Sequence, residues 1–336
     1  MKAIVLDQPG QFSTTELPAP QPQAGEALVR ISRVGMCGTD LHAYRGRQPF
    51  FTYPRILGHE LSVEIVEAKS PDLPAGMRCA VEPYLHCGVC LACRNGKTNC
   101  CVKLQVLGVH IDGGLREYCT VPQHKLHPSA ALTPEQLALV EPLCIGGHAV
   151  ARAQLRPAET ILIIGAGPIG LAVMAHAQVV GVKMIVLDVS EDRLRFAREH
   201  FKVSATIQAG EQVSEQLADL TNGEMPSVVF DATGNPASMN ESFNYPANGG
   251  RLILVGLHLD FVTFRDQDFH RRELTVMSSR NATATDFQRT IALLEAGQID
   301  ITPWVTHRVN DSELIAQFPS WLDAKAGFIK AIVAWS

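Results

Sequence analysis

The sequence predicts an α/β protein of two domains, one mainly β and one built on a doubly wound parallel sheet. Its 336 residues are too many for one ordinary hydrophobic core. Residues 1 to about 128 contain short alternating segments broken by Pro and Gly, which is typical of antiparallel strands. Between about 160 and 280, strand-like and helical stretches alternate, which indicates a parallel sheet covered by helices on both faces.

Composition and charge argue against several classes of function. Hydrophobic residues make up 46% of the chain and charged residues 19%, as in soluble globular proteins. The net charge of −5 argues against a nucleic-acid partner, because neutralising phosphates needs a basic surface. No secretory signal is visible at the N-terminus, so we expect a cytoplasmic location. The apolar stretch 161–187 is long enough to span a membrane, but its glycines and polar residues favour a buried strand, turn and helix instead.

The segment from Cys37 to Glu60 combines metal-binding and proton-moving groups in the first domain. Strands are expected in residues 1–35 and at Leu61–Val66 and Cys79–Glu82. Between them, Cys37, His59 and Glu60 are of the types that hold a catalytic zinc and leave one position open. The competing interpretation is a buried free thiol and a hydrogen-bonded core histidine.

A second group of cysteines follows at close spacing. Nine cysteines in a chain with no visible leader indicate metal ligands or buried thiols rather than disulfides. Four thiolates on short turns can converge tetrahedrally on a structural zinc, and the predicted ligands are Cys87, Cys90, Cys93 and Cys101. A redox pair is the alternative, but such pairs need two thiols at a βα junction. Cys100 is a substitute for the fourth ligand.

Helical periodicity begins at Thr133, which would be the N-cap of a helix with Pro134 at its first position. Glu141 falls inside this apolar run, where a solvated carboxylate would be costly. Its side chain faces either water or a cation. We favour a cation, because buried carboxylates are usually paired or bind metals.

The second domain begins with a glycine-rich turn between a strand and a helix. Strands are expected at Thr160–Ile164, Met184–Leu187, Ala205–Ile207, Val228–Asp231, Arg251–Val255 and Leu274–Met277, and one of the helices between them at Glu191–His200. After the first strand, the turn permits close approach of a pyrophosphate at a helix N-terminus; its residues are Gly165, Gly167, Pro168, Ile169 and Gly170. Asp188 ends the next strand, where ribose hydroxyls would lie, which predicts NAD. Arg193, also assigned to the cofactor site, and Arg195 follow and keep NADP open.

The C-terminal residues are too few for a third domain. A helix is expected at Asp286–Ala296 and an apolar strand at FIKAIVAW, residues 328–335. We expect this segment to return and complete the first domain. The predicted domains are therefore 1–144 with 284–336, and 145–283.

Taken together, the motifs resemble those of the zinc-containing medium-chain alcohol and polyol dehydrogenases along the whole chain. The matching motifs are CGTDLH (37–42), GHE (58–60), the four-Cys lobe (87–101), GVHIDGG (108–114), EPL (141–143), GAGPIG (165–170) and VTHR (305–308). Within the family, YRGRQPFFTYPRILGHE, DATGNPASMN and SSRNAT are most similar to sugar-acid oxidoreductases of the L-galactonate 5-dehydrogenase type. The resemblance implies a GroES-like catalytic domain, a Rossmann domain, an active-site cleft between them, and a homo-oligomer, either a dimer or a tetramer.

The resemblance also implies roles for individual residues. Cys37 and His59 would ligate the catalytic zinc, Glu60 would be a direct or alternating ligand, and Glu141 would hold the metal or its water. Thr39 would take the substrate proton, and His42 would pass it to solvent. With the structural ion, this gives two zinc ions per chain. The segment Lys69–Cys79 is shorter than the family's usual loop, which we expect to alter a surface turn only.

These residues predict oxidation of a secondary alcohol in a sugar acid or polyol, with hydride transfer to NAD. Substrate contacts are assigned to Tyr44, His110, Arg280 and Asn281, with Arg280 as the partner of a carboxylate. Arg45 and Arg47 are either further contacts or solvated loop residues. Three alternatives stay open: a general alcohol or polyol dehydrogenase of the sorbitol or threonine type, a zinc-free reductase, and a non-catalytic nucleotide-sensing protein.

Overall fold

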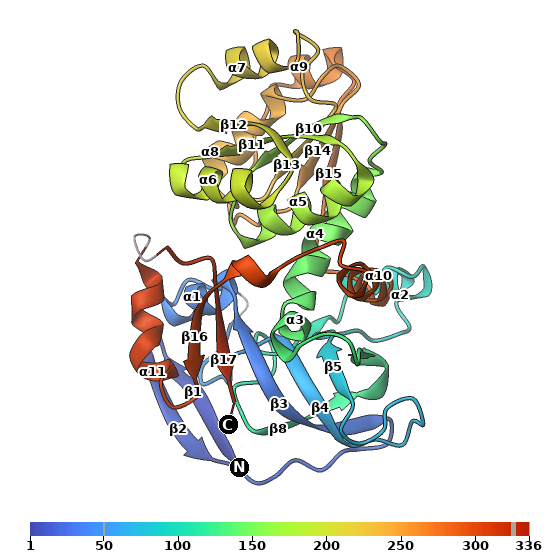
Figure 1. Ribbon diagram of the computed structural model, residues 1–336, viewed down its shortest axis with the longest axis vertical. Coiled ribbons are helices and arrows are strands. Elements are labelled where there is room, and N and C mark those ends of the chain that lie inside the picture. Colours follow the sequence, from blue (N-terminus) through green and yellow to red (C-terminus); the bar gives the residue numbers. More distant parts are fainter. Residues whose placement is uncertain (50, 324–326, 336) are drawn as a thin grey trace. The chain divides into compact units, whose positions relative to one another are not determined.

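The computed structural model describes residues 1–49, 51–323 and 327–335, and the chain divides into two units (Figure 1). Unit 1 contains Met1–Glu141 and Thr283–Ser336, and unit 2 contains Pro142–Ala282. The predicted fold class is confirmed, because unit 1 is mainly β and unit 2 is a parallel sheet covered by helices. No helix in the described part of the chain is long and apolar enough to cross a membrane.

Unit 1 is organised around a seven-stranded mixed sheet. Its strand order is β16-β17-β3-β4-β5-β9, with β8 also paired to β3. The bounds are β3 (Glu26–Met36), β4 (Glu60–Glu67), β5 (Arg78–Val81), β8 (Tyr118–Pro122), β9 (Leu126–Pro128), β16 (Val305–Asn310) and β17 (Lys330–Ala334). The chain's C-terminal strand β17 thus pairs antiparallel with β3, the strand that leads to Cys37.

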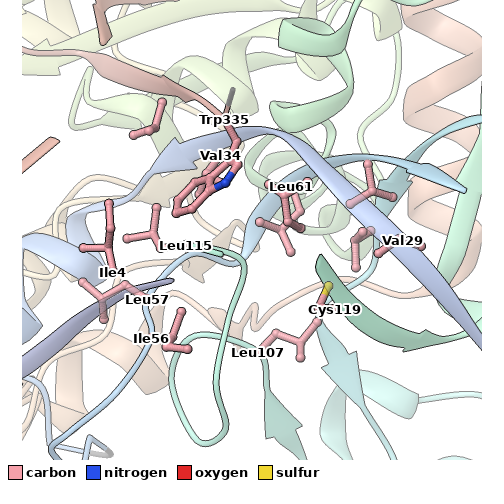
Figure 2. Packing of buried hydrophobic residues seen from close by; sticks show 14 of the residues in the cluster. Ile4, Val29, Val34, Ile56, Leu57, Leu61, Leu107, Leu115, Cys119 and Trp335 are labelled. Carbon is pink, nitrogen blue, oxygen red and sulfur yellow. The ribbon is translucent and has the colours of Figure 1, made fainter. Parts of the chain in front are cut away.

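Smaller elements complete unit 1. Two two-stranded antiparallel sheets pair β1 (Lys2–Gln8) with β2 (Gln11–Glu16), and β6 (Tyr84–Leu85) with β7 (Gln105–Val106). The helices are α1 (Gly38–Tyr44), α2 (Leu91–Arg94), α3 (Pro134–Ala138), α10 (Ala284–Glu295) and α11 (Leu314–Gln317), with 3₁₀ turns η1 (Thr98–Cys100), η2 (Gln123–Lys125), η4 (Thr302–Trp304) and η5 (Phe318–Leu322). Figure 2 shows buried side chains from several of these segments converging into one core, among them Ile4, Val34, Leu61, Leu115 and Trp335.

The helical run that begins at Thr133 is two helices rather than one. Helix α3 ends at Ala138, and α4 (Val140–Ala153) begins after Leu139. Pro142 gives the physical reason, because a proline ring clashes with the carbonyl of the residue four positions earlier in a continuous helix. That residue is Ala138. In the first turn of α4 the missing N–H of Pro142 has no cost, and Glu141 is set at the start of the new helix.

Unit 2 is a six-stranded, all-parallel sheet in the order β12-β11-β10-β13-β14-β15. Its strands are β10 (Thr160–Ile164), β11 (Lys183–Asp188), β12 (Val203–Gln208), β13 (Val228–Asp231), β14 (Arg251–Leu254) and β15 (Thr275–Ser278). The helical segments are α5 (Pro168–Val180), α6 (Glu191–His200), α7 (Val213–Leu220), α8 (Pro236–Glu241), η3 (Ser242–Asn244) and α9 (Asp266–Arg271). Numbered along the chain, the strand order is 3-2-1-4-5-6, which is that of dinucleotide-binding sheets.

A buried ion pair in unit 1 joins the residue that follows β5 to the residue that precedes β9. The Nζ of Lys125 donates to Glu82, whose other oxygen lies 3.3 Å from Nε2 of His127, and both charged side chains are 1% exposed. We expect Glu82→Gln to lower the melting temperature by at least about 6 °C, because it leaves a buried ammonium without its counter-charge. Glu64→Gln, which breaks an exposed pair with Arg30, is the matched control and should shift it by less than about 3 °C. Equal shifts in thermal melts would contradict this account.

Candidate active site

Three predicted metal ligands converge in unit 1. One ligand atom from each of Cys37, His59 and Glu60 lies within 4.8 Å of the others. Cys37 follows β3 and precedes α1, and Glu60 is the first residue of β4, so the antiparallel pairing of β3 with β4 brings the two ends together. The register places Gly35 opposite Glu60, and a Cβ at residue 35 would lie 2.2 Å from Oε2 of Glu60. Only glycine leaves room for this carboxylate.

A second loop holds the segment that carries His59. Residues 113–115 donate three backbone hydrogen bonds to Ile56, Leu57 and Gly58, at 2.8 to 3.0 Å. A Cβ at Gly113 would lie 2.2 Å from the carbonyl oxygen of Gly58, so the two backbones are in direct contact. The GVHIDGG motif therefore fixes the position of the GHE turn. Its His110 is half-buried, and Nδ1 accepts a hydrogen bond from the backbone N–H of Val106 at 3.1 Å.

Asp40 is a site residue that the sequence reasoning missed. Its Oδ2 accepts a hydrogen bond from the backbone N–H of Cys37 at 2.8 Å, and its Oδ1 lies 3.8 Å from Nδ1 of His59. A metal-binding histidine usually directs its second ring nitrogen toward a carboxylate, and Asp40 is placed for that role. The motif CGTDLH (37–42) contained a sign of this role, because an aspartate follows the candidate ligand Cys37 by three residues.

The donor set fits a zinc ion. It offers a thiol, an imidazole and a carboxylate, which are the groups that zinc takes at catalytic sites. Within the described residues, neither Nδ1 of His59 nor Oδ1 of Asp40 has a hydrogen-bond partner. Burial alone would lower the pKa of His59, but the charge of Asp40 and a hydrogen bond with Cys37 hold that pKa well above its ordinary value. Surroundings that favour a proton on His59 also favour a metal cation.

Glu60 and Glu141 have different partners. Both oxygens of Glu60 accept hydrogen bonds from the Nζ of Lys330, at 2.6 and 2.9 Å. Oε1 of Glu141 accepts a hydrogen bond from the hydroxyl of Tyr84. Burial and the neighbouring charge of Glu60 raise the pKa of Glu141 to about 7. Lys330 and Tyr84 were also missed, although a lysine inside the apolar strand FIKAIVAW signals a buried counter-charge.

The predicted proton-transfer residues lie on α1. Oγ1 of Thr39 is 3.7 Å from Sγ of Cys37, so the structure brings Thr39 to the metal set. His42 is exposed on the last turn of the helix. Tyr44, predicted as a substrate contact, packs its ring against those of Phe12 and Phe318, with centroids 5.4 and 4.9 Å apart. That packing accounts for the aromatic side chain without a substrate.

The four predicted lobe thiols also converge. The sulfur atoms of Cys87, Cys90, Cys93 and Cys101 lie within 4.8 Å of one another. Sγ of Cys101 accepts backbone hydrogen bonds from Cys87 and Lys103, at 3.2 and 3.3 Å. Hydrogen bonding from the backbone of Cys93 lowers the pKa of Cys90 to about 6, which favours the metal-binding thiolate. Cys100 is exposed and does not belong to this cluster.

In unit 2, the glycine-rich turn joins β10 to α5. Gly165 has a φ of +93°, and a Cβ at Gly170 would lie 1.7 Å from the carbonyl oxygen of Gly165. Gly167 is the N-cap and Pro168 the first residue of a 13-residue helix, and Ile169 follows half-buried. The turn can therefore present the free N–H groups of α5 to a phosphate.

Asp188 lies at the end of β11 and is 5% exposed. Its two oxygens accept hydrogen bonds from the backbone N–H groups of Ala166, at 2.6 Å, and Ser190, at 2.8 Å. The carboxylate thus belongs to the glycine-rich turn itself. Arg193 approaches Asp188 to 4.0 Å, so an acidic and a basic side chain lie together where ribose would bind.

The remaining predicted substrate residues lie at the C-terminal end of unit 2. Arg280 is exposed, whereas Asn281 is half-buried with a φ of +50°. Among the described residues, Nδ2 of Asn281 has no hydrogen-bond partner although that atom is buried. A buried amide donor of this kind is suited to a polar ligand.

Comparison with known proteins assigns the chain to a family. The family model for the alcohol dehydrogenase GroES-like domain matches residues 23–131, and that for zinc-binding dehydrogenase matches residues 168–296. The chain is 39% identical to L-galactonate-5-dehydrogenase of Escherichia coli K12, over 100% of this chain and 99% of that protein. The chain belongs to the zinc-containing medium-chain alcohol dehydrogenase family.

Two further similarities agree with this membership. Sorbitol dehydrogenase of Bacillus subtilis is 37% identical over 76% of this chain and 75% of that protein. The crystal structure of the alcohol dehydrogenase RspB from Escherichia coli CFT073, complexed with NADH, has a TM-score of 0.93 at 30% identity and covers 99% of both chains. With this family's fold, a zinc-type donor set and a glycine-rich turn hydrogen-bonded to Asp188, the protein is an NAD-dependent zinc dehydrogenase acting on CH–OH groups.

Two ligand sets of different composition predict two zinc ions per chain with separable roles. Cys37→Ser should reduce activity below about 1% of wild type while the melting temperature changes little, because only the catalytic ion is affected. Cys93→Ser should instead lower the melting temperature, and Cys100→Ser is the matched control that should leave both unchanged. Elemental analysis is the direct check. A carefully prepared dehydrogenase with one zinc ion or none would contradict the prediction.

The geometry at Asp188 predicts the cofactor preference of this dehydrogenase. A buried carboxylate accepts hydrogen bonds from ribose hydroxyls and repels the extra phosphate of NADP. We expect kcat/KM with NAD⁺ to exceed that with NADP⁺ by at least about tenfold, and Arg193→Ala to widen the ratio. Steady-state kinetics with both cofactors give the ratio. A preference for NADP⁺ would show that Arg193, and not Asp188, determines which cofactor the dehydrogenase prefers.

Proposed function

We propose that this dehydrogenase oxidises a secondary alcohol of a sugar acid or polyol, most closely L-galactonate, to the ketone and transfers hydride to NAD⁺. The observation that carries the proposal is the full-length 39% identity to L-galactonate-5-dehydrogenase. The convergent Cys37, His59 and Glu60 set supports the same reaction type, because a zinc-free reductase of this fold has no need of it.

The residues of unit 1 supply the proton chemistry in this proposal. Zinc, when bound by Cys37, His59 and an acidic side chain, acts as a Lewis acid that lowers the pKa of an alcohol. Thr39 takes the substrate proton, because its hydroxyl lies beside Cys37. His42 then passes this proton to solvent, for which its exposed position is suitable.

The polar side chains proposed to contact substrate select polyhydroxylated molecules over simple alcohols. His110, Arg280 and Asn281 all carry hydrogen-bonding groups. Nδ2 of Asn281, which has no partner in the described part of the chain, is a donor for a hydroxyl or carbonyl oxygen. Buried donors discriminate against substrates that leave them unpaired, because desolvation then goes uncompensated. Arg280 is proposed as the carboxylate partner, since its planar fork can bind both oxygens.

A general polyol dehydrogenase is the second candidate, favoured by the similarity to sorbitol dehydrogenase. It differs from the first in making no use of a substrate carboxylate. The cytoplasmic location and the homo-oligomeric state stay predictions. A non-catalytic nucleotide-sensing role would show itself as NAD binding without turnover.

A substrate panel tests the proposal. We expect the highest kcat/KM with L-galactonate or another sugar acid, lower values with sorbitol and threonine, and the lowest with ethanol. Arg280→Ala should lower kcat/KM for the sugar acid by about ten- to a hundredfold, because a charge-assisted hydrogen bond is lost. The same change should alter the value for the matching neutral polyol by less than about threefold.

Arg30→Ala, on an exposed strand position of unit 1, is the matched arginine control and should change neither value. Preference for ethanol over every sugar acid and polyol would refute the substrate assignment. Equal losses for sugar acid and polyol in the Arg280 variant would remove that residue's proposed role.

A further inference from the structure

Asp231 is a fully buried carboxylate at the end of β13, beside the glycine-rich turn of unit 2. The register of the sheet places it directly opposite Ile164, the last residue of β10 before that turn. Oδ1 accepts hydrogen bonds from the backbone N–H and the hydroxyl of Thr233, at 2.9 and 2.6 Å. Oδ2 accepts one from the hydroxyl of Ser238, at 2.6 Å. Neither the proposed hydride transfer nor the cofactor residues assigned so far make use of this carboxylate.

The side chain of Thr233 is held in one orientation. Its hydroxyl donates to Asp231 and accepts a hydrogen bond from the backbone N–H of Asn235, at 3.1 Å. A threonine hydroxyl that is fixed on both sides also fixes the direction of the methyl group, because the two share one staggered χ1. A Cβ at Gly165 would lie 3.1 Å from Cγ2 of Thr233. The methyl group therefore faces the first glycine of the turn.

The glycine-rich turn is thus held from both of the strands that flank β10. On the β11 side, Asp188 accepts a hydrogen bond from the backbone N–H of Ala166. On the β13 side, Asp231 acts through the methyl group of Thr233. The φ of +93° at Gly165 is open to glycine but is one of many conformations it adopts, so the neighbouring groups must select it.

The position of this contact in the sheet connects it to the cofactor. Between β10 and β13 the order of the strands reverses, and doubly wound sheets bind their ligands at the carboxyl ends of the strands at that point. The glycine-rich turn and Thr233 both follow those carboxyl ends. A turn that is fixed before NAD arrives binds it more tightly, because less conformational freedom is lost on binding.

We infer that Asp231 is a positioning residue of the cofactor site, which through Thr233 holds the glycine-rich turn in the shape that binds the pyrophosphate of NAD. Asp231 does not touch the cofactor, because it is 0% exposed and its two oxygens are engaged by Thr233 and Ser238. The inference concerns cofactor binding and does not depend on the substrate proposed above.

Calorimetric titration of the intact protein tests this role without catalysis. The probes are NADH and ADP-ribose, which contains the pyrophosphate but no nicotinamide. Asp231→Ala should raise the Kd of both at least about tenfold, because the turn loses its support on one side. Thr233→Val, which loses the hydroxyl, and Thr233→Ser, which loses the methyl group, should each raise both values at least about threefold. Adding Thr233→Val to Asp231→Ala should change them by less than about twofold, since the two residues act in series.

Three controls separate positioning from a loss of stability. In Asp231→Asn the amide oxygen still accepts from Thr233 and the amide nitrogen donates to Ser238, so both Kd values should stay within about threefold of wild type. Ser238→Ala should keep them within about twofold, because Thr233 is still held. Thr221, which precedes β13, also has a hydroxyl that donates to one backbone group and accepts from another. Thr221→Val should lower the melting temperature and leave both Kd values unchanged.

Three outcomes would overturn the inference. Unchanged Kd values in Asp231→Ala would show that the carboxylate does not act on the turn, and the two Thr233 variants decide the matter if Asp231→Ala does not fold. Weaker binding of NADH with unchanged binding of ADP-ribose would place the effect at the nicotinamide instead of the pyrophosphate. Weaker binding of both probes in Thr221→Val would show that cofactor affinity follows the stability of unit 2 as a whole.

Discussion

The concentration of buried negative charge around His59 is the constraint on which the rest of the structure depends. Asp40, Glu60 and Glu141 are each no more than 5% exposed, and Cys37 adds a potential thiolate. Carboxylates in such surroundings must be paired, protonated or bound to a metal. Lys330 balances Glu60, and a divalent cation is the group that would balance the others. The centre is therefore better suited to holding zinc than to remaining without a cation.

The fold of unit 1 follows from the need to bring these groups together from distant parts of the chain. The pairing of β3 with β4 joins Cys37 to Glu60, and the pairing of β17 with β3 adds Lys330. The break before α4 places Glu141 at a helix start. Unit 2 differs, because its cofactor turn is one continuous strand, turn and helix, completed by Asp188 from the neighbouring strand. Unit 1 brings its site residues together from segments that are far apart in the sequence, whereas the cofactor turn of unit 2 is formed mainly by consecutive residues.

This difference explains how much the sequence could predict. Strands β10 and β13, helix α6, the glycine-rich turn and the four-Cys lobe depend on local patterns, and all were found with correct or nearly correct bounds. Asp40, Tyr84 and Lys330 were missed, because each acts through a partner that only tertiary structure identifies. The break at Leu139 was missed because apolar periodicity outweighed the signal of Pro142. The packing of Tyr44 against Phe12 and Phe318 was likewise out of reach of the sequence, because it joins three distant segments.

The most direct test of the central claim is to follow a deuterium atom from substrate to cofactor. The claim is that this chain transfers hydride from a sugar-acid CH–OH carbon to NAD⁺ and needs the zinc held at Cys37 and His59 to do so. L-Galactonate labelled with deuterium at the oxidised carbon should give deuterated NADH by mass spectrometry. The transfer should stop when a chelator removes the zinc ion from the site at Cys37 and His59, and it should return when zinc is added. Unlabelled NADH, or label transfer that persists after this ion is removed, would contradict the account.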